Sequence, residues 1–195
     1  MTELELVRRA KAGDRLAMTE LVSAHFAQVH RLALHILRNE PDAEDATQNT
    51  FVKAFANLQR FDEQRSFEPW LLRIATRESL MIQRAERTRF AFWQRSVRDE
   101  RSEESTESIV QVREERRELW RAVNQLKTKD RLVLTLSYFM GMSEAEMAVT
   151  LDIKPGTVKS RKHNALLHLR AVVEQQFTWL SRGAAEEPES KAVSR

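Results

Sequence analysis

Apolar residues recur every three or four positions over residues 14–38, which predicts one long amphipathic helix. Asp14 follows Gly13 and is a suitable N-cap for this helix. The apolar positions are Leu16, Leu21, Val22, Phe26, Val29, Leu32, Ala33, Ile36 and Leu37. A helix with such a stripe is expected to bury it against neighbouring elements.

Two further amphipathic helices are predicted in the first half of the chain. One covers residues 41–58, where Pro41 is tolerated in the first turn. Its apolar face consists of Phe51, Phe55 and Leu58. The other begins near residue 66, and its apolar stripe consists of Trp70, Leu71, Ile74 and Met81. Three such helices suffice for a helical bundle.

The second half of the chain repeats the helical pattern in shorter segments. Two helices from about residue 109 are marked by Val112, Trp120, Val123 and Leu126, then by Leu132, Val133, Leu136 and Phe139. After Gly141, Ser143 and Glu146 form a capping-box pattern that opens a short helix to about Leu151. Residues 152–154 predict a tight turn, and Pro155 suits the start of a second short helix. This arrangement is typical of a helix-turn-helix.

Composition supports an all-α fold and excludes several chemistries. The 195 residues include four Gly, four Pro and no Cys, so turn residues are scarce and disulfides, thiolate metal sites and cysteine nucleophiles are excluded. The charged amino terminus lacks the apolar core of a signal peptide, and no apolar run reaches membrane-spanning length. We therefore expect a cytoplasmic protein with no membrane insertion.

The net charge of +3 is small, but the charges are unevenly distributed. Residues 73–98 hold seven Arg against two acids, whereas residues 99–118 hold eight acids against four Arg. Residues 99–108 contain no large apolar side chain, which is typical of a solvated linker. The predicted organisation is two helical bundles at residues 1–89 and 107–180, a flexible linker at 90–106 and a disordered tail at 181–195.

The start of the last predicted helix is the candidate DNA-binding segment. In a helix-turn-helix the second helix enters the major groove, where its first residues meet base edges and phosphates. The candidate contacts are Lys154, Thr157, Lys159, Ser160, Arg161, Lys162 and His163. Arg161 or Lys162 could read guanine, while Val158, Leu166 and Leu169 are expected on the buried face. The alternative is an ordinary capped helix with a basic exposed face.

An acidic cluster over residues 40–48 lies at the start of the second predicted helix. Asp42 and Asp45 share a helix face but supply too few oxygens for a hard metal ion. Acids at this position stabilise the helix dipole, and they could also dock a basic partner. On chemistry alone both interpretations stay open.

Aromatic and cationic side chains are mixed before the third predicted helix. Phe61, Phe67 and Trp70 accompany Arg60 and Arg65. Such a mixture can hold unstacked bases, but aromatic side chains at a helix junction more often form core.

No catalytic or metal-binding constellation is found in the sequence. His25, His30 and His35 recur every five residues, which rotates them off any common helix face, and His163 and His168 do the same. Phosphate-binding loops, nucleophile elbows and paired metal-binding histidines are missing from the sequence. We expect neither enzymatic activity nor a cofactor.

The order of these parts resembles the extracytoplasmic-function (ECF) sigma factors of bacteria. Residues 42–75 are similar to region 2 of that family, and residues 141–170 are similar to region 4. With the flanking helices the resemblance covers about residues 4–173. It implies an alternative sigma factor that binds core RNA polymerase and promoter DNA, with an anti-sigma factor as a further partner.

The resemblance also implies roles for individual residues. The implied polymerase-binding residues are Asp42, Asp45, Gln48, Asn49 and Phe51. The loop at 61–67 would capture a flipped base of the −10 element and the adjoining basic helix would help to open the duplex; the implied residues are Arg60, Phe61, Arg65, Phe67, Arg73 and Arg77. Trp70 is expected to pack in the core. Residues 155–163 would read the −35 element.

Four positions depart from the family pattern. Asn49 replaces a usual acid, Arg77 a usual Asn, Met81 a usual Asp and Lys154 a usual Pro. Two other interpretations also stay open. One is a stand-alone helix-turn-helix repressor or activator whose first bundle serves dimerisation or ligand binding. The other is a helical adaptor whose basic helix contacts an acidic protein.

Overall fold

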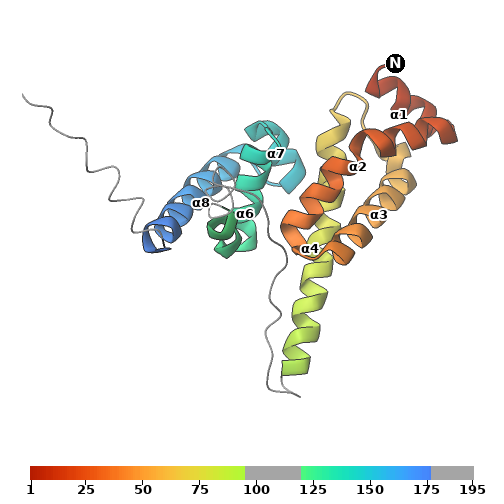
Figure 1. The fold of residues 1–195 in the computed structure, drawn as a ribbon. Helices are drawn as coiled ribbons and strands as arrows, with labels where there is room; N and C mark the ends of the chain where they lie inside the picture. Colours follow the sequence, from red (N-terminus) through yellow and green to blue (C-terminus); the bar gives the residue numbers. More distant parts are fainter. Residues whose placement is uncertain (95–119, 177–195) are drawn as a thin grey trace, which may run out of the picture.

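The computed structural model describes residues 1–94 and 120–176, and all regular secondary structure in these two ranges is helical. The predicted all-α fold is therefore confirmed there. Figure 1 shows two groups of helices, one coloured red to yellow-green and one green to blue, which pack against each other.

The first group consists of α1 (Glu3–Lys11), α2 (Arg15–Leu37), α3 (Glu40–Asn57), the short 3₁₀ helix η1 (Leu58–Arg60) and α4 (Phe67–Gln94). Asp14 caps α2 as predicted, because its carboxylate accepts hydrogen bonds from the first free N–H groups of that helix. Pro41 lies in the first turn of α3, also as predicted. Helix α1 was not among the helices predicted from the apolar spacing, although the resemblance implied flanking helices from about residue 4.

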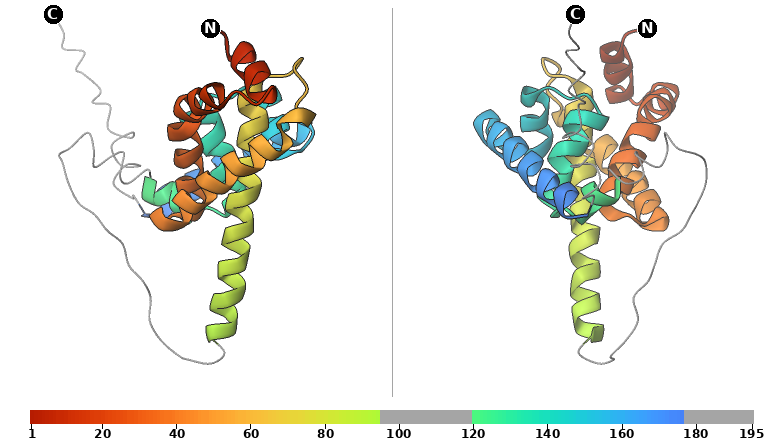
Figure 2. Two further views of the ribbon diagram at one scale, coloured as in Figure 1. Left: turned by 90° about the vertical axis from the view of Figure 1, so that its right-hand side faces the viewer. Right: turned by 60° about the vertical axis from the view of Figure 1, so that its left-hand side comes forward.

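Helix α4 is longer than the sequence suggested. It has 28 residues and extends beyond the other helices in both views of Figure 2. The first five positions of the predicted linker, residues 90–94, therefore belong to a helix. The rest of that linker, the start of the predicted second bundle and the predicted disordered tail lie outside the described residues.

The apolar stripes of the first group form one core. Its most buried large side chains are Leu21, Leu32, Ile36, Leu58, Leu71 and Leu72. Leu16, Phe26 and Met81, which the spacing placed in the stripes, are instead 71, 46 and 52% exposed. On α2 the neighbouring Ala17 and His25 take the buried positions. The apolar stripes of these helices are broader than the faces that neighbouring helices cover, so residues at the stripe margins stay exposed.

The second group consists of helical residues 120–125, α6 (Thr128–Leu134), the π-helical η2 (Thr135–Phe139), α7 (Glu144–Leu151) and α8 (Pro155–Gln176). Ser143 and Glu146 form the predicted capping box, and Asp152 ends α7 with a φ of 56°. Helix α8 begins at Pro155 as predicted. It is not short, however, but 22 residues long, because it packs against α6 as well as α7.

The two groups pack against each other in this structure, and buried apolar residues of both contribute to one hydrophobic cluster. Arg131 of α6 is 5% exposed and reaches the C-terminal end of α2. Its Nε donates to the carbonyl of His35 at 3.0 Å, and its Nη2 donates to the carbonyl of Ile36 at 3.1 Å. The ring of His35 stacks on Trp120 with 4.6 Å between centroids. A buried cation therefore joins α6 to α2, and a ring stack joins helical residues 120–125 to α2.

The pH dependence of folding should report on His35. Burial, followed by the charges of Arg31 and Arg131, lowers the pKa of His35 from 6.5 to about 4. Between pH 6.5 and about 4, His35 is protonated in the unfolded chain but not in the folded protein. The free energy of unfolding should therefore fall as the pH drops through this range. We expect His35→Phe, which keeps an aromatic ring but cannot be protonated, to lose less stability there than wild type in urea denaturation. Parallel pH profiles for the two proteins would contradict this assignment.

Candidate nucleic-acid interface

The start of α8 gathers the predicted −35 residues on one short segment. Of these, Lys154, Lys159, Ser160 and His163 are exposed, and Thr157, Arg161 and Lys162 are half-buried. Val158 is fully buried and anchors the opposite face. Leu166, which was predicted to pack there, is 38% exposed because Ala165 takes the buried position. The segment therefore offers hydroxyl and cationic groups to a ligand, and its contacts with DNA stay a prediction.

Tyr138 of η2 is a neighbour of this segment that the sequence did not reveal. The ring is 59% exposed, and the Nζ of Lys162 lies 5.7 Å from its centroid. A cation held over an aromatic face loses part of its freedom before any ligand arrives. The only local signal in the sequence is an exposed aromatic residue shortly before Gly141.

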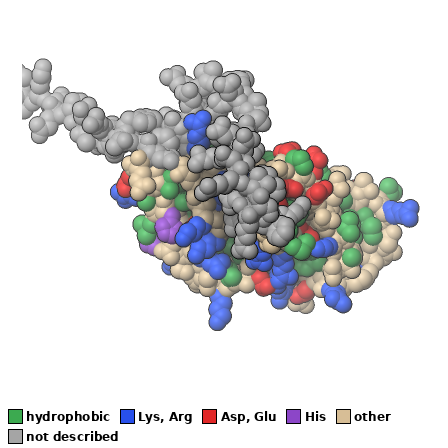
Figure 3. Space-filling view, turned by 90° about the horizontal axis from the view of Figure 1, so that it is seen from below, with side chains coloured by type: hydrophobic (Ala, Val, Ile, Leu, Met, Phe, Trp, Pro, Cys, Tyr) green, Lys and Arg blue, Asp and Glu red, His purple; other side chains and the backbone are tan. Residues whose placement is uncertain are grey.

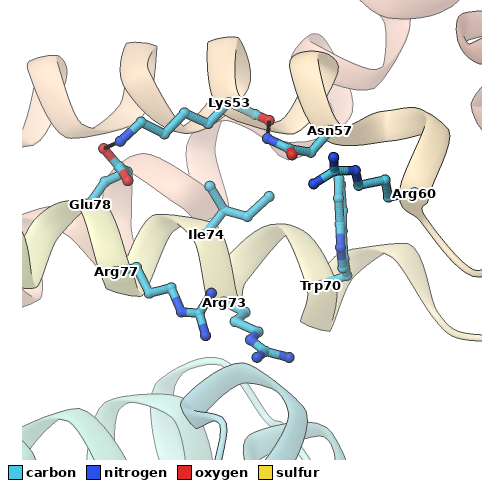
Figure 4. Close-up of a pocket in the computed structure, with 8 residues that line it drawn as sticks. All are labelled: Lys53, Asn57, Arg60, Trp70, Arg73, Ile74, Arg77 and Glu78. Carbon is cyan, nitrogen blue, oxygen red and sulfur yellow. Dashed lines mark hydrogen bonds and ion pairs between the residues drawn. The ribbon is translucent and has the colours of Figure 1, made fainter.

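A pocket of about 320 Å³ lies between α3 and α4 (Figure 4). It is lined by Lys53, Asn57, Arg60, Trp70, Arg73, Ile74, Arg77 and Glu78. The single acid of this lining, Glu78, is buried and accepts a hydrogen bond from Lys53 Nζ at 2.6 Å. Figure 4 shows Arg60 beside Trp70 at one end, and Arg73 and Arg77 extending toward the second group of helices. An aromatic wall surrounded by cations suits an unstacked base and its phosphate.

Trp70, rather than Phe61 or Phe67, contributes an aromatic ring to the pocket. Phe61 and Phe67 are only 4 and 3% exposed, so neither ring faces a ligand. Trp70 packs against the core as expected, but it is only half-buried and also forms a wall of the pocket. The reason is tertiary: the ammonium of Lys11 covers Phe61, and the ring of His25 lies 5.4 Å from that of Phe67.

The four arginines implied for the −10 element lie in three different settings. Arg60 is exposed and lines the pocket. Arg65 is exposed and pairs with Asp62 of its own loop at 3.2 Å, but it is not part of the pocket lining. Arg73 and Arg77 line the pocket from α4. The structure therefore brings three of the four arginines together.

Arg73 and Arg77 are engaged by the turn of the helix-turn-helix. The Oδ2 atom of Asp152 lies 2.6 Å from Arg73 Nη2 and 2.7 Å from Arg77 Nη2. Next to this pair, the hydroxyl of Thr150 donates to the carbonyl of Pro69 at 3.4 Å. A carboxylate thus occupies two guanidinium groups that were predicted to contact DNA. Sequence reasoning missed this contact because Arg77 and Asp152 are 75 residues apart.

Three of the predicted polymerase-binding residues form an exposed stripe on α3. Asp45, Gln48 and Asn49 are exposed, and Val52, which the sequence did not single out, continues the stripe with 67% exposure. The spacing of these residues places them on neighbouring turns of one helix face. We call Asp45, Gln48, Asn49 and Val52 the α3 stripe.

The other two predicted polymerase-binding residues lie differently. Phe51 is 7% exposed and packs near Phe55, so its ring is not available to a partner in this structure. Asp42 is half-buried in the first turn of α3, where a carboxylate stabilises the helix dipole. The two interpretations of the acidic cluster therefore fall on different residues, since Asp42 suits the dipole and Asp45 faces outward.

In Figure 3 several acidic side chains gather on one part of the face, and others lie directly beside cationic ones. Among residues 1–94 and 120–176, no three His, Asp or Glu side chains are placed to share a metal ion. Two histidines pair with acids instead: His25 with Glu3 at 2.9 Å and His30 with Glu40 at 3.2 Å.

Among residues 1–94 and 120–176, no helix combines the length and apolar character needed to cross a bilayer.

Comparison with known proteins agrees with this architecture. The family model for Sigma-70 region 2 matches residues 21–89, and that for Sigma-70 region 4 matches residues 116–169. RNA polymerase sigma factor NccH of Alcaligenes xylosoxydans xylosoxydans is 31% identical over 173 residues, which cover 87% of this chain and 93% of NccH. ECF RNA polymerase sigma factor SigL of Mycobacterium tuberculosis is 31% identical over 171 residues, which cover 87% of this chain and 96% of SigL.

A solved structure of CnrH in complex with the cytosolic domain of CnrY has a similar fold. Its TM-score is 0.68 at 26% identity, and the match covers 89% of this chain and 98% of CnrH. The two relatives above span nearly their whole length at more than 30% identity. The chain therefore belongs to the extracytoplasmic-function family of RNA polymerase sigma factors.

Proposed function

We propose that this alternative sigma factor uses three surfaces to direct core RNA polymerase to promoter DNA. The α3 stripe docks on the polymerase, the pocket beside Trp70 takes an unstacked base of the −10 element, and the start of α8 reads the −35 element. The observation that carries the proposal is the pocket, because three arginines and a lysine surround its aromatic wall in a chain that also has a helix-turn-helix. The role is one of binding rather than catalysis.

Promoter binding by both surfaces requires the two groups of helices to separate. The −10 and −35 elements are about 25 base pairs apart, which corresponds to about 85 Å of duplex. In the structure, Asp152 of the helix-turn-helix lies 2.6 Å from Arg73 in the pocket wall. The two surfaces cannot reach both elements from this position, so α6–α8 must move away from α4.

An anti-sigma factor is a further part of the proposal. The relative CnrH was solved in complex with the cytosolic domain of CnrY. A partner that holds α7 against α4 would keep Arg73 and Arg77 paired with Asp152 and away from DNA. We place these events in the cytoplasm, with the polymerase and the chromosome.

Run-off transcription tests the proposed function. The purified chain and sigma-free core polymerase should together give discrete transcripts from a cognate promoter. Neither component should do so alone. A stand-alone repressor or activator, or a helical adaptor, would give none, and that result would overturn the proposal.

Asp45→Arg should disrupt polymerase binding without unfolding the bundle. Asp45 is exposed on the α3 stripe, and reversing its charge places a cation against a surface that we infer to be basic. We expect about tenfold weaker association with core polymerase, which corresponds to about 1.4 kcal/mol. Glu20→Arg, an equal charge reversal at an exposed position of α2, is the control. Unchanged co-purification of Asp45→Arg with core polymerase would remove the α3 stripe from the proposal.

A further inference from the structure

Helix α1 lies outside the residues that match region 2, which begin at residue 21, yet it holds the loop at residues 61–66. Lys11 Nζ donates to the carbonyl of Phe61 at 2.9 Å and to Glu63 Oε1 at 2.9 Å. Arg8 Nε donates to the other carboxylate oxygen of Glu63 at 2.9 Å. In return, Gln59 Nε2 donates to the carbonyl of Lys11 at 2.6 Å. The contacts join residues about 50 positions apart and define what we call the loop clamp.

On the α1 side of the loop clamp, Lys11 is shielded from solvent, whereas the side chain of Arg8 is 60% exposed. The side chain of Lys11 is 16% exposed and that of Glu63 is 33% exposed. Hydrogen bonds from Arg8 and then Lys11 lower the pKa of Glu63, so its carboxylate remains charged at neutral pH. Lys11 also lies over the ring of Phe61, with 5.8 Å from Nζ to the centroid. One ammonium therefore contacts the backbone, the ring and the acid of a single loop.

The clamped loop connects two walls of the pocket. Arg60, at one wall, directly precedes Phe61, and the ring of Phe61 lies 5.1 Å from that of Trp70 at another. Asp62 closes the loop on itself, since its carbonyl accepts from the N–H of Arg65 at 3.0 Å. A displacement of Phe61 would therefore shift Arg60 and remove support from Trp70.

We propose that Lys11 and Arg8 are positioning residues for the capture of an unstacked promoter base. They hold Glu63 and the Phe61 backbone, and through them they set where Arg60 lies beside Trp70 at one end of the pocket. This inference rests on the proposed function of the pocket. It assigns to α1 a part in promoter opening, not in polymerase docking or −35 recognition.

Base flipping by the reconstituted holoenzyme tests the clamp. The probe is a cognate promoter with 2-aminopurine at the −10 base, whose fluorescence rises when the base leaves the stack. Lys11→Met should slow this rise about threefold to tenfold, because it removes charge-assisted hydrogen bonds that are partly screened by solvent. Arg9→Met is the matched control, since it removes one positive charge from the same helix. Arg9 pairs with Asp14 and not with the loop.

A double-mutant cycle separates a clamp from general destabilisation. Glu63→Gln keeps the shape of the side chain and should slow base flipping in the same direction. The double variant should be no slower than the slower single variant, with core-polymerase affinity and melting temperature close to wild type. Additive losses, or Lys11→Met as fast as Arg9→Met, would overturn the clamp while the wild-type holoenzyme still opens the promoter. Failure of the wild type itself would overturn the proposed function, and the clamp with it.

Discussion

Arg131→Met is expected to lower the free energy of unfolding by about 2–4 kcal/mol, because it removes hydrogen bonds from a buried charged donor. Arg131 is 5% exposed and donates to carbonyls on both sides of the contact between the two helix groups. Methionine fills much of the volume but cannot donate. The carbonyl of Ile36 keeps a hydrogen bond from Gln83 at 3.0 Å, whereas the carbonyl of His35 loses the donor described above.

Urea denaturation measures this loss, and Arg170→Met provides the control. Arg170 makes an exposed ion pair with Glu174 at 2.7 Å, and such pairs contribute about 0–1 kcal/mol. If both substitutions cost the same, Arg131 would not be the cation that holds α6 to α2. Small-angle scattering adds a second measurement, since undocking of α6 should increase the radius of gyration of Arg131→Met relative to Arg170→Met.

Local sequence signals predicted the starts of three helices well. Asp14 caps α2, Ser143 and Glu146 open α7, and Pro155 starts α8, each at the position that the sequence indicated. These features depend on side chains that bond to backbone groups within the same turn. A boundary with such a cap is therefore encoded in a few adjacent residues.

Side-chain burial in the candidate site could not be predicted from the same signals. Whether Phe61 or Trp70 faces the pocket depends on α1, whose Lys11 covers Phe61 from 50 positions away. The hydrophobic pattern of the sequence shows that Phe61 and Trp70 are both apolar. It does not show which of the two is covered by a helix that is distant in the sequence. Phe51 is a similar case, since its place in the polymerase-binding set was carried over from a family pattern and its burial comes from packing within the bundle.

Contacts between the two helix groups had no sequence signal. The pairing of Asp152 with Arg73 and Arg77 joins a turn residue to a basic helix, and each part alone is ordinary. At position 77 this chain has Arg where the family usually has Asn. In the structure this arginine is a second cation that pairs with Asp152. When the two helix groups separate, Arg73 and Arg77 become accessible to DNA phosphates. Phosphates compete with the Asp152 carboxylate for the same guanidinium groups.

Arg161→Ala should weaken binding of the holoenzyme to the upstream promoter element and relax its preference for one base pair. Arg161 is half-buried on α8, close to the fully buried Val158 that fixes this turn of the helix. A bidentate contact between arginine and guanine contributes about 1–3 kcal/mol of discrimination, so the affinity should fall about 5- to 150-fold on the preferred sequence. Binding to a promoter already altered at that base pair should change much less.

Lys159→Ala is the comparison that gives the Arg161 result its meaning. Lys159 is exposed on the same turn of α8 and is suited to a phosphate contact. Its loss should weaken binding to all sequences alike and reduce the salt dependence by about one unit of slope. Binding isotherms over a range of salt concentrations and base substitutions distinguish the two effects. If Arg161→Ala also lost affinity equally on every sequence, Arg161 would be a phosphate contact, and the base-reading side chain would have to be sought among its neighbours, with Lys162 beside Tyr138 as the next residue to test.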